Sequence, residues 1–460
     1  MLEDLLRSYK SGFKNYTELR AQVNKSRQVT LLAGNMVTNT RKAEGGVSAR
    51  VYSGGTFGFA CGAEYSDENI KNVLSAAASN ARFMDKHVCK GMPPLPAAIA
   101  GNIGLKTIPG EELPQSLLID YAKSLDSMIA GKYKNLTSRT VIANCLGIEK
   151  LLVVSDGADS HFFQPRSLVY VFMTAETDDG VPVELFKPFG GFGRFNENFT
   201  DAALLMDELD VIYESLMHKR EGVYSNAGLH KCVLHSELAG ILAHEAVGHT
   251  VEADIVLGGS VAATNLNKQV ASELVTMVDF AHTALGAPCP LPVYVDDEGI
   301  FAEDVLLIEN GILKNFMHNR ETARHFDVMP QGNARGFAFS DEPLIRMRNT
   351  AILPGTSKLE DMIASIDDGY YLVKSGNGQA DTTGEFMFSV ELGYEIKNGK
   401  LGKAIRETTI SGIAFEMLKS VDMLSDEMHW ECSGFCGKKQ FMTTGMGGPA
   451  IRCDLNIGGR

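Results

Sequence analysis

Helical and strand-like segments follow one another in clusters along this chain of 460 residues, and not as the regular βαβ units that build a parallel sheet. Two strand-like stretches near the start flank a Gly-Gly turn. Two Asn-Gly pairs, Asn310-Gly311 and Asn398-Gly399, each lie between apolar runs, and each predicts a tight hairpin of antiparallel strands. The pattern therefore favours the α+β class.

Prolines indicate where the chain is divided. Five of the fifteen prolines lie between Gly91 and Pro114, which makes this stretch the clearest candidate for a domain boundary. We predict four parts: an N-terminal α+β domain with a helix and an antiparallel sheet over residues 1–90, a proline-rich linker over 91–115, a middle α+β domain over 116–226, and a β-rich C-terminal domain over 227–460.

Composition excludes several classes of partner. The chain has 43 Lys and Arg against 57 Asp and Glu, a net charge of −14, whereas binding to a nucleic-acid backbone needs clustered basic residues. No apolar run approaches the roughly 20 residues that cross a bilayer. Acidic residues near Met1 stand where a signal peptide needs basic ones. We therefore expect a soluble, cytoplasmic protein that binds neither nucleic acid nor membrane.

One helical segment of the C-terminal domain departs from ordinary core sequence. It is predicted to be capped by Ser236, and its apolar run is interrupted by His244, Glu245 and His249. The usual zinc-protease helix has its histidines four residues apart, but here they are five apart and would diverge by about 140° on a regular helix. A π-bulge would bring them together, and Gly248 lowers the resistance to such a distortion. We therefore predict a locally widened helix with both imidazoles on one metal.

A third protein ligand is needed, because a catalytic zinc site has three protein ligands and one open position. The eight cysteines are too sparse for a disulfide scaffold and are expected to stay reduced. Cys436 has a glycine on either side within two residues, which favours it as the most accessible thiol near the C-terminus. Cys432 is the rival candidate.

These residues resemble the TldD/PmbA family of intracellular metallopeptidases, whose metal-bearing branch has a His-Glu-x-x-x-His helix like that of His244, Glu245 and His249. In this family the third metal ligand is a cysteine in a Cys-Gly-Lys segment, and the resemblance therefore implies Cys436. The likeness extends along most of the chain. Further matching segments are residues 45–50, 346–350, 376–381, 386–389, 409–412 and 457–460.

The resemblance implies a metal-dependent peptidase that hydrolyses unfolded or flexible peptides. One divalent metal per active subunit, expected to be zinc, would bind His244, His249 and Cys436 and activate a water. Glu245, which is next to a ligand in sequence, would be the general base. The family likeness also implies a homodimer, or a heterodimer with a relative that lacks the motif, in which peptides reach the site through a narrow cleft.

Two alternatives remain open at this point. The chain could be a non-catalytic regulatory or partner subunit with a structural metal, in which case Cys432 would join Cys436 to close the ligand set. A weaker alternative is a thiol-dependent hydrolase that uses Cys436 with His244.

Two further expectations concern peptide binding. An extended peptide is expected to add a strand to an exposed sheet edge, supplied by the β-rich region after residue 290. Arg346 and Arg348 lie two residues apart in a strand-like stretch, so both side chains would share one face. There they would meet a substrate carboxylate or face solvent.

Overall fold

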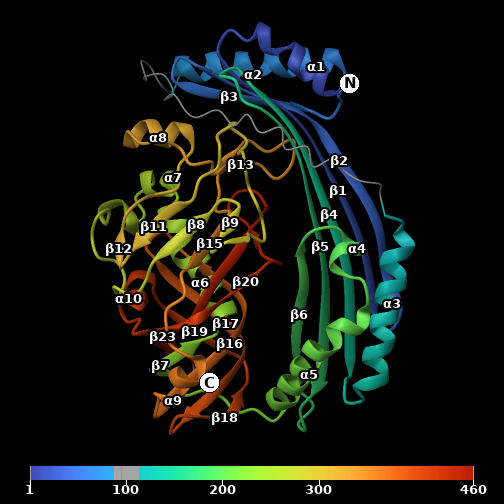
Figure 1. The fold of residues 1–460 in the computed structure, drawn as a ribbon, viewed down its shortest axis with the longest axis vertical. Helices are drawn as coiled ribbons and strands as arrows, with labels where there is room; N and C mark the ends of the chain where they lie inside the picture. The colour runs from blue at the N-terminus through green and yellow to red at the C-terminus, as the bar shows by residue number, and fades with distance from the viewer. Residues whose placement is uncertain (1, 88–94, 96–112, 459–460) are drawn as a thin grey trace.

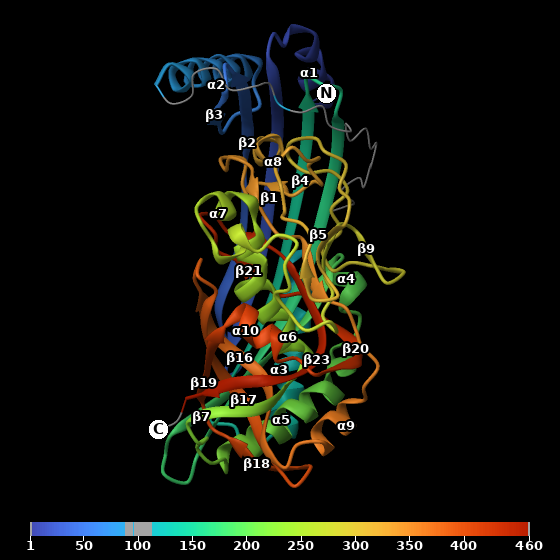
Figure 2. The same cartoon turned by 90° about the vertical axis from the view of Figure 1, so that its left-hand side faces the viewer.

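A computed structural model describes residues 2–87, 95 and 113–458. It contains two large β-sheets with helices grouped around them, which confirms the α+β class. Figures 1 and 2 show the first sheet as a long, curved layer along one side of the molecule, with the second sheet and the C-terminal helices opposite it. None of the helices in the described part of the chain combines the length and apolar character that a membrane crossing needs.

The first sheet has six strands, and every neighbouring pair in it is antiparallel. The strand order is β3-β2-β1-β4-β5-β6, so β3 and β6 form its edges. Most of these strands are much longer than the usual five or six residues. Their bounds are β1 Tyr16–Leu32, β2 Asn35–Ser53, β3 Thr56–Gly62, β4 Ser138–Val154, β5 Asp159–Glu176 and β6 Pro182–Phe192.

Helices cover this sheet at both ends. Residues spaced three and four apart, Ile70, Val73, Ala77 and Ala81, form the buried face of α2. Gly58 of β3 allows this helix to approach closely, because a Cβ there would lie 2.1 Å from the amide nitrogen of Ala81. At the other end, α3 lies on the face turned away from the second sheet (Figures 1 and 2). The helix bounds are α1 Leu2–Ser8, α2 Asp67–His87, α3 Gln115–Lys132, α4 Phe195–Asn198 and α5 Met206–Arg220.

The first sheet unites strands from both ranges that the prolines separate. Strand β1 pairs with β4 continuously, from Glu18 opposite Val154 to Leu32 opposite Thr140. Residues 1–90 and 116–226 therefore contribute to one layer, and their division into two domains stays a prediction. Most of the predicted linker over 91–115 lies outside the described residues.

The second sheet has eleven strands, and β23 occupies its centre, where it pairs with β7, β15, β19 and β20. The helices of this half pack around it and share its apolar core. The bounds are β7 Gly228–Leu234, β8 Met277–Phe280, β11 Val305–Glu309, β12 Ile312–Leu313, β15 Asn349–Ile352, β16 Asp368–Ala380, β17 Glu385–Lys397, β18 Lys400–Ile405, β19 Thr408–Ile413, β20 Met423–Glu431 and β23 Gly445–Ile457. The helices are α6 Ser236–Leu242, α7 Ala253–Leu257, α8 Arg320–Phe326, α9 Leu359–Ala364 and α10 Ala414–Lys419. Three two-stranded ribbons complete this half: β9 Thr283–Ala284 with β10 Ala287–Pro288, β13 Ala334–Arg335 with β14 Leu344–Ile345, and β21 Phe435–Cys436 with β22 Met442–Thr443.

Both predicted hairpins are confirmed. Asn310 and Gly311 join β11 to β12, and Asn398 and Gly399 join β17 to β18. All four residues have positive φ, between 46° and 82°. Two consecutive residues with positive φ match the twist of the strands that they connect, which is why Asn-Gly is a strong hairpin signal.

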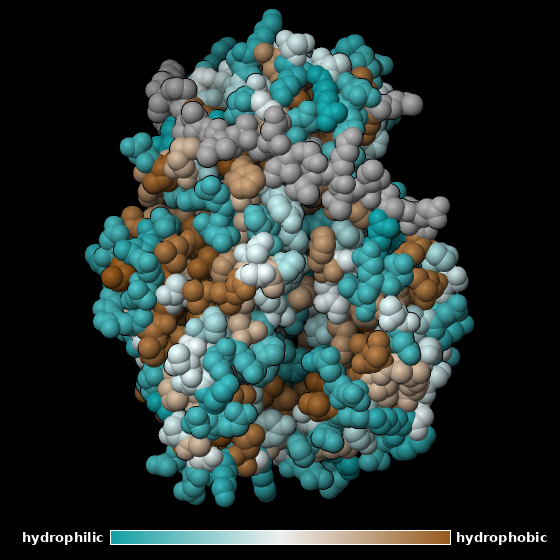
Figure 3. All heavy atoms as spheres, viewed as in Figure 1, coloured by the Kyte–Doolittle hydropathy of each residue, from teal (hydrophilic) through white to brown (hydrophobic). Residues whose placement is uncertain are grey.

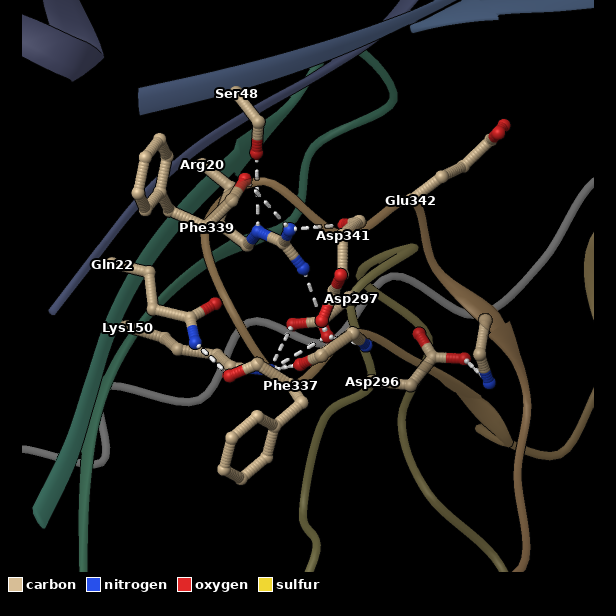
Figure 4. A network of polar contacts seen from close by, with 12 residues as sticks. Arg20, Gln22, Ser48, Lys150, Asp296, Asp297, Phe337, Phe339, Asp341 and Glu342 are labelled. Atoms are coloured by element: carbon tan, nitrogen blue, oxygen red, sulfur yellow. Dashed lines mark hydrogen bonds and ion pairs between the residues drawn. The ribbon is translucent and has the colours of Figure 1, made fainter. Parts of the chain in front are cut away.

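Buried charges join the two halves of the molecule, whose surface is hollowed between them lower down (Figure 3). Arg20 of β1 and Lys150 of β4 point from the first sheet toward Asp297 of the second half (Figure 4), at 3.1 and 2.7 Å. Lys150 also donates to the carbonyl of Gly336, and Arg20 donates to that of Asp341. Burial lowers the pKa of Lys150 to about 8, although the charge of Asp297 opposes the shift. This charge network (Arg20, Lys150, Asp297) holds the segment 336–342 against the first sheet.

We expect Asp297→Ala to lower the free energy of unfolding by about 3–5 kcal/mol, because it leaves the charges of Arg20 and Lys150 buried without their carboxylate. Chemical denaturation and the melting temperature measure this loss. Asp368→Ala is the matched control: its partner Lys397 and Asp368 itself are 46% and 69% exposed, so only a small change is expected. Equal effects of the two substitutions would show that the buried network does not join the halves.

Candidate metal centre

The helix that carries the candidate ligands starts on the second sheet. Its N-cap is His235, whose ring nitrogen accepts a hydrogen bond from the amide of Glu237. Ser236 is the first residue of α6 and not its cap, so that detail of the prediction is wrong. Gly240 lets the helix lie against β23, because a Cβ there would come within 3.0 Å of the amide nitrogen of Gly447.

The predicted widening of this helix is present. Residues Ala243–Gly248 form a π-helix between α6 and a short 3-10 turn. The rings of His244 and His249 consequently lie 5.2 Å apart between centroids and almost at right angles. A turn that bonds i to i+5 therefore brings together two histidines that a regular helix would separate.

Gly248 is needed here for packing and not for an unusual backbone conformation. Its φ of −54° and ψ of −47° are ordinary helical values. A Cβ at this position would lie 2.1 Å from the sulfur of Met347. The missing side chain thus allows the π-helix to sit directly against the segment that contains Met347.

Cys436 approaches these histidines from the ribbon of β21 and β22. Its Sγ lies 3.2 Å from Nε2 of His249. One candidate ligand atom from each of His244, His249 and Cys436 lies within 4.8 Å of the others, and within 2–87, 95 and 113–458 this is the one group of three or more such residues. Cys432 lies outside it, and its Sγ is 3.8 Å from the carbonyl oxygen of Trp430.

The surroundings of His244 fit a bound metal ion. Its side chain is fully buried, and neither ring nitrogen has a hydrogen-bond partner among the described residues. A buried polar atom without a partner is costly and uncommon in a native protein. A metal ion would satisfy the nitrogen that faces His249 and Cys436, and the N,N,S donor set is one that zinc accepts.

The electrostatics favour a thiolate at this point. Burial alone would raise the pKa of the Cys436 thiol, but the two imidazoles beside it outweigh burial and lower that pKa to about 4. Burial would also lower the pKa of His249, yet the nearby Glu252 and Cys436 raise it well above its ordinary value. The thiolate is the form of cysteine that binds metals.

Glu252 contacts one of the candidate ligands, and the sequence prediction assigned it no role. It is fully buried, and its carboxylate lies 2.7 Å from Nδ1 of His249. A histidine that binds metal through one nitrogen usually donates the other N–H to a carboxylate, which fixes its orientation. The spacing of three residues, one helical turn, is the signal from which this contact could have been predicted.

Glu245 lies beside the group of ligand atoms. Its carboxylate oxygens are 3.6 Å from Nε2 of His249 and 3.9 Å from Nε2 of His244. The side chain keeps 28% of its surface exposed, in contrast to the buried His244. A carboxylate in this place can accept a proton from a molecule bound at the three candidate ligands and can exchange it with solvent.

Sequence comparison assigns the chain to a known family. The model for the PmbA/TldA metallopeptidase C-terminal domain matches residues 227–459, and that for PmbA/TldA metallopeptidase domain 1 matches residues 17–81. The chain belongs to the TldD/PmbA family. This confirms the family that the sequence motifs indicate.

Named relatives of this TldD/PmbA protein include metalloproteases. The zinc metalloprotease TldD homolog of Saccharolobus solfataricus is 34% identical over 268 residues, which cover 56% of this chain and 60% of that protein. A metalloprotease of Methanocaldococcus jannaschii is 28% identical over 449 residues, 95% of this chain and 96% of that protein. The crystal structure of TldE from Thermococcus kodakarensis has the same fold, with a TM-score of 0.76 and 17% identity over the full length of both chains.

The two arginines near residue 347 have a structural role in this TldD/PmbA protein. Arg346 is fully buried and donates to the carbonyl oxygens of Cys436 and Gln440, at 2.9 and 2.8 Å. Arg348 is fully buried against Asp279. Both interpretations from the sequence, a substrate carboxylate and a solvated surface, are therefore wrong. Arg346 instead holds the segment that follows the candidate ligand Cys436.

A pocket of about 230 Å³ is lined by residues that are close in sequence to the candidate metal centre of this family member. Ile241 and Phe435 line it, and these residues are four positions before Glu245 and one before Cys436. Its other walls include residues of β6, β16, β17, β20 and β23, so it lies between the two halves. Ser375 of β16 is among these walls.

Proposed function

We propose that this chain is a metal-dependent peptidase that hydrolyses unfolded or flexible peptides. One observation carries the proposal: a fully buried histidine with two unpartnered nitrogens, His244, lies together with His249 and Cys436 beside the carboxylate of Glu245. Membership of the TldD/PmbA family and the names of its relatives support the same activity.

The proposed metal is a single zinc ion held by His244, His249 and Cys436. When bound, zinc supplies a water of lowered pKa and polarises the scissile carbonyl. Three protein ligands leave a fourth position for water, as in other catalytic zinc sites. Cys432, which could have closed the set, lies outside the group, and this favours a catalytic site over a structural one.

The remaining chemistry belongs to side chains of the protein. Glu245 acts as the general base: its carboxylate takes a proton from the attacking water and delivers it to the nitrogen of the leaving amine. Glu252 accepts from Nδ1 of His249, and this fixes the ring so that Nε2 faces Cys436. Burial of His244 keeps its imidazole away from bulk water.

The peptide is proposed to lie extended along the open edge of β16. This strand pairs with β7 only from Gly369 to Leu372, and no other described strand covers that side of residues 375–380. Ser375 of this edge lines the same pocket as Ile241 and Phe435. Main-chain hydrogen bonds to the edge would bind peptides with little regard to sequence. Pairing with a second copy or with a relative that lacks the motif, and a cytoplasmic location, stay predictions from the sequence.

Removal of metal tests the proposed activity. Purified protein is expected to hydrolyse an unstructured peptide, to lose this activity after treatment with a zinc chelator, and to regain it when zinc is returned. Activity that survives the chelator but is lost after treatment with a thiol-alkylating reagent would instead support the thiol-dependent hydrolase that uses Cys436 with His244. Bound zinc without hydrolysis would favour the regulatory subunit.

A further inference from the structure

Lys438 makes a set of contacts that the proposed reaction does not use. Its Nζ lies 2.8 Å from the carboxylate of Asp254, 3.2 Å from that of Glu252 and 3.1 Å from the carbonyl oxygen of Ile345. Its side chain is only 8% exposed. A buried ammonium group needs such partners, because an unpaired charge in the interior is very costly.

These contacts bridge two separate parts of the candidate metal centre. Lys438 follows Cys436 by two residues, whereas Glu252 and Asp254 follow His249 on the helical side. Glu252 uses the same carboxylate oxygen toward Nδ1 of His249 and toward Lys438. Lys438 is therefore two residues from Cys436 in sequence, and only the side chain of Glu252 separates it from His249.

The segment around Cys436 needs such support. The ribbon of β21 and β22 has only two residue pairs, and a Cβ at Gly437 would meet nothing within 4 Å. Two cations hold this short segment from different sides: Arg346 binds its carbonyl oxygens, and Lys438 binds the acidic residues that follow His249. Arg346 does not contact the histidine helix in any described hydrogen bond, so Lys438 is the one of these two cations that links the segment to the residues after His249.

We propose that Lys438 is a positioning residue that sets the distance between the Cys436 thiolate and the His249 imidazole. It ties the cysteine segment to Glu252, the carboxylate that orients His249, and thereby assembles the three-ligand group from two distant parts of the chain. This inference rests on the proposed function, since it assigns Lys438 a role at the same metal centre.

Substitution by methionine tests the proposal, because Lys438→Met keeps the length of the side chain and removes its charge. Zinc affinity, measured by competition with a chelator of known affinity, is expected to fall about 10–100-fold, the usual effect of losing an outer partner of a metal ligand. Lys439→Met is the matched control, since Lys439 is the next residue and is exposed. It is expected to keep the affinity of the unchanged protein.

A spectroscopic measurement separates positioning from a general loss of stability. In cobalt-substituted protein, the thiolate-to-metal charge-transfer band reports whether Cys436 binds the ion. Lys438→Met is expected to weaken or shift this band at full cobalt occupancy, whereas Lys439→Met leaves it unchanged. Asp254→Asn is a second variant, which removes the charge of a partly exposed partner of Lys438 and is expected to fold. It should change the band in the same direction as Lys438→Met, but by a smaller amount.

Coupling between Lys438 and Glu252 gives an independent readout. A double-mutant cycle compares the loss of zinc affinity that Glu252→Gln causes in two backgrounds. The loss is expected to be about 2–100-fold smaller in Lys438→Met than in the unchanged protein. Additive effects, with a cobalt spectrum and affinity equal to those of Lys439→Met, would overturn the proposal.

Hydrogen exchange of the metal-free protein keeps this test apart from that of the peptidase. Faster exchange over residues 434–444 in Lys438→Met, but not in Lys439→Met, is expected even if the protein hydrolyses no peptide. A protein that binds zinc through this group without hydrolysis would therefore refute the proposed function and leave the role of Lys438 intact. Unchanged exchange together with unchanged zinc affinity would refute the role of Lys438.

Discussion

Glu245→Gln is expected to slow peptide hydrolysis by about 10²–10⁴-fold, the range that a positioned general base contributes. Glutamine has nearly the same shape as glutamate but cannot accept the proton of the attacking water. The carboxylate lies beside the candidate ligand atoms, 3.6 Å from Nε2 of His249, and is not one of the three proposed ligands. Zinc content should therefore stay at the level of the unchanged protein, which elemental analysis of the same preparation measures.

The control for this substitution is Glu273→Gln, a change of the same kind at an exposed glutamate. It is expected to leave hydrolysis and zinc content unchanged. Two results would contradict the role of Glu245. Full activity of Glu245→Gln would exclude it as the base, and loss of zinc together with activity would make it a ligand.

Cys436→Ser is expected to weaken zinc binding by more than the roughly 10–100-fold that loss of an outer partner costs, because it removes a ligand itself. A serine hydroxyl is not ionised near neutral pH and is a poor partner for zinc in comparison with a thiolate. Hydrolysis should fall together with zinc content, and addition of excess zinc should restore only part of it. Chelator competition and activity at several zinc concentrations measure both effects.

Cys432→Ser is a closely matched control, four residues away and on the same segment. Its sulfur lies outside the group formed by His244, His249 and Cys436. Zinc binding and hydrolysis are expected to survive this change. The reverse outcome, loss of zinc in Cys432→Ser and retention in Cys436→Ser, would reassign the third ligand and require a rearranged ribbon.

Local features of the structure could be predicted from the sequence, because the relevant interactions are between near neighbours. The five-residue spacing of His244 and His249 predicts the π-helix, since only a widened turn brings such residues together. The Asn-Gly pairs predict their hairpins because the required positive φ values are a property of these residue types.

Interactions between distant residues could not be predicted in the same way. Arg346 is buried because it binds carbonyl groups about 90 positions later in the chain, and nothing in the local pattern distinguishes it from a surface arginine. The pairing of β1 with β4 joins strands that are separated by more than a hundred residues. Strand alternation specifies the faces of a strand but not its partner.

Through the charge network between the halves, the candidate metal centre is supported by more of the chain than the half that carries its ligands. All three candidate ligands come from the second half. Arg20 and Lys150 of the first sheet nevertheless hold residues 336–342 in place. This segment in turn contacts Gln440, through the amide of Phe337 and the carbonyl of Glu342. A fragment limited to residues 227–458 would keep every ligand and expose Asp297 without its cations. The first sheet thus supports the cysteine segment from a distance, through residues 336–342, although it carries no candidate ligand.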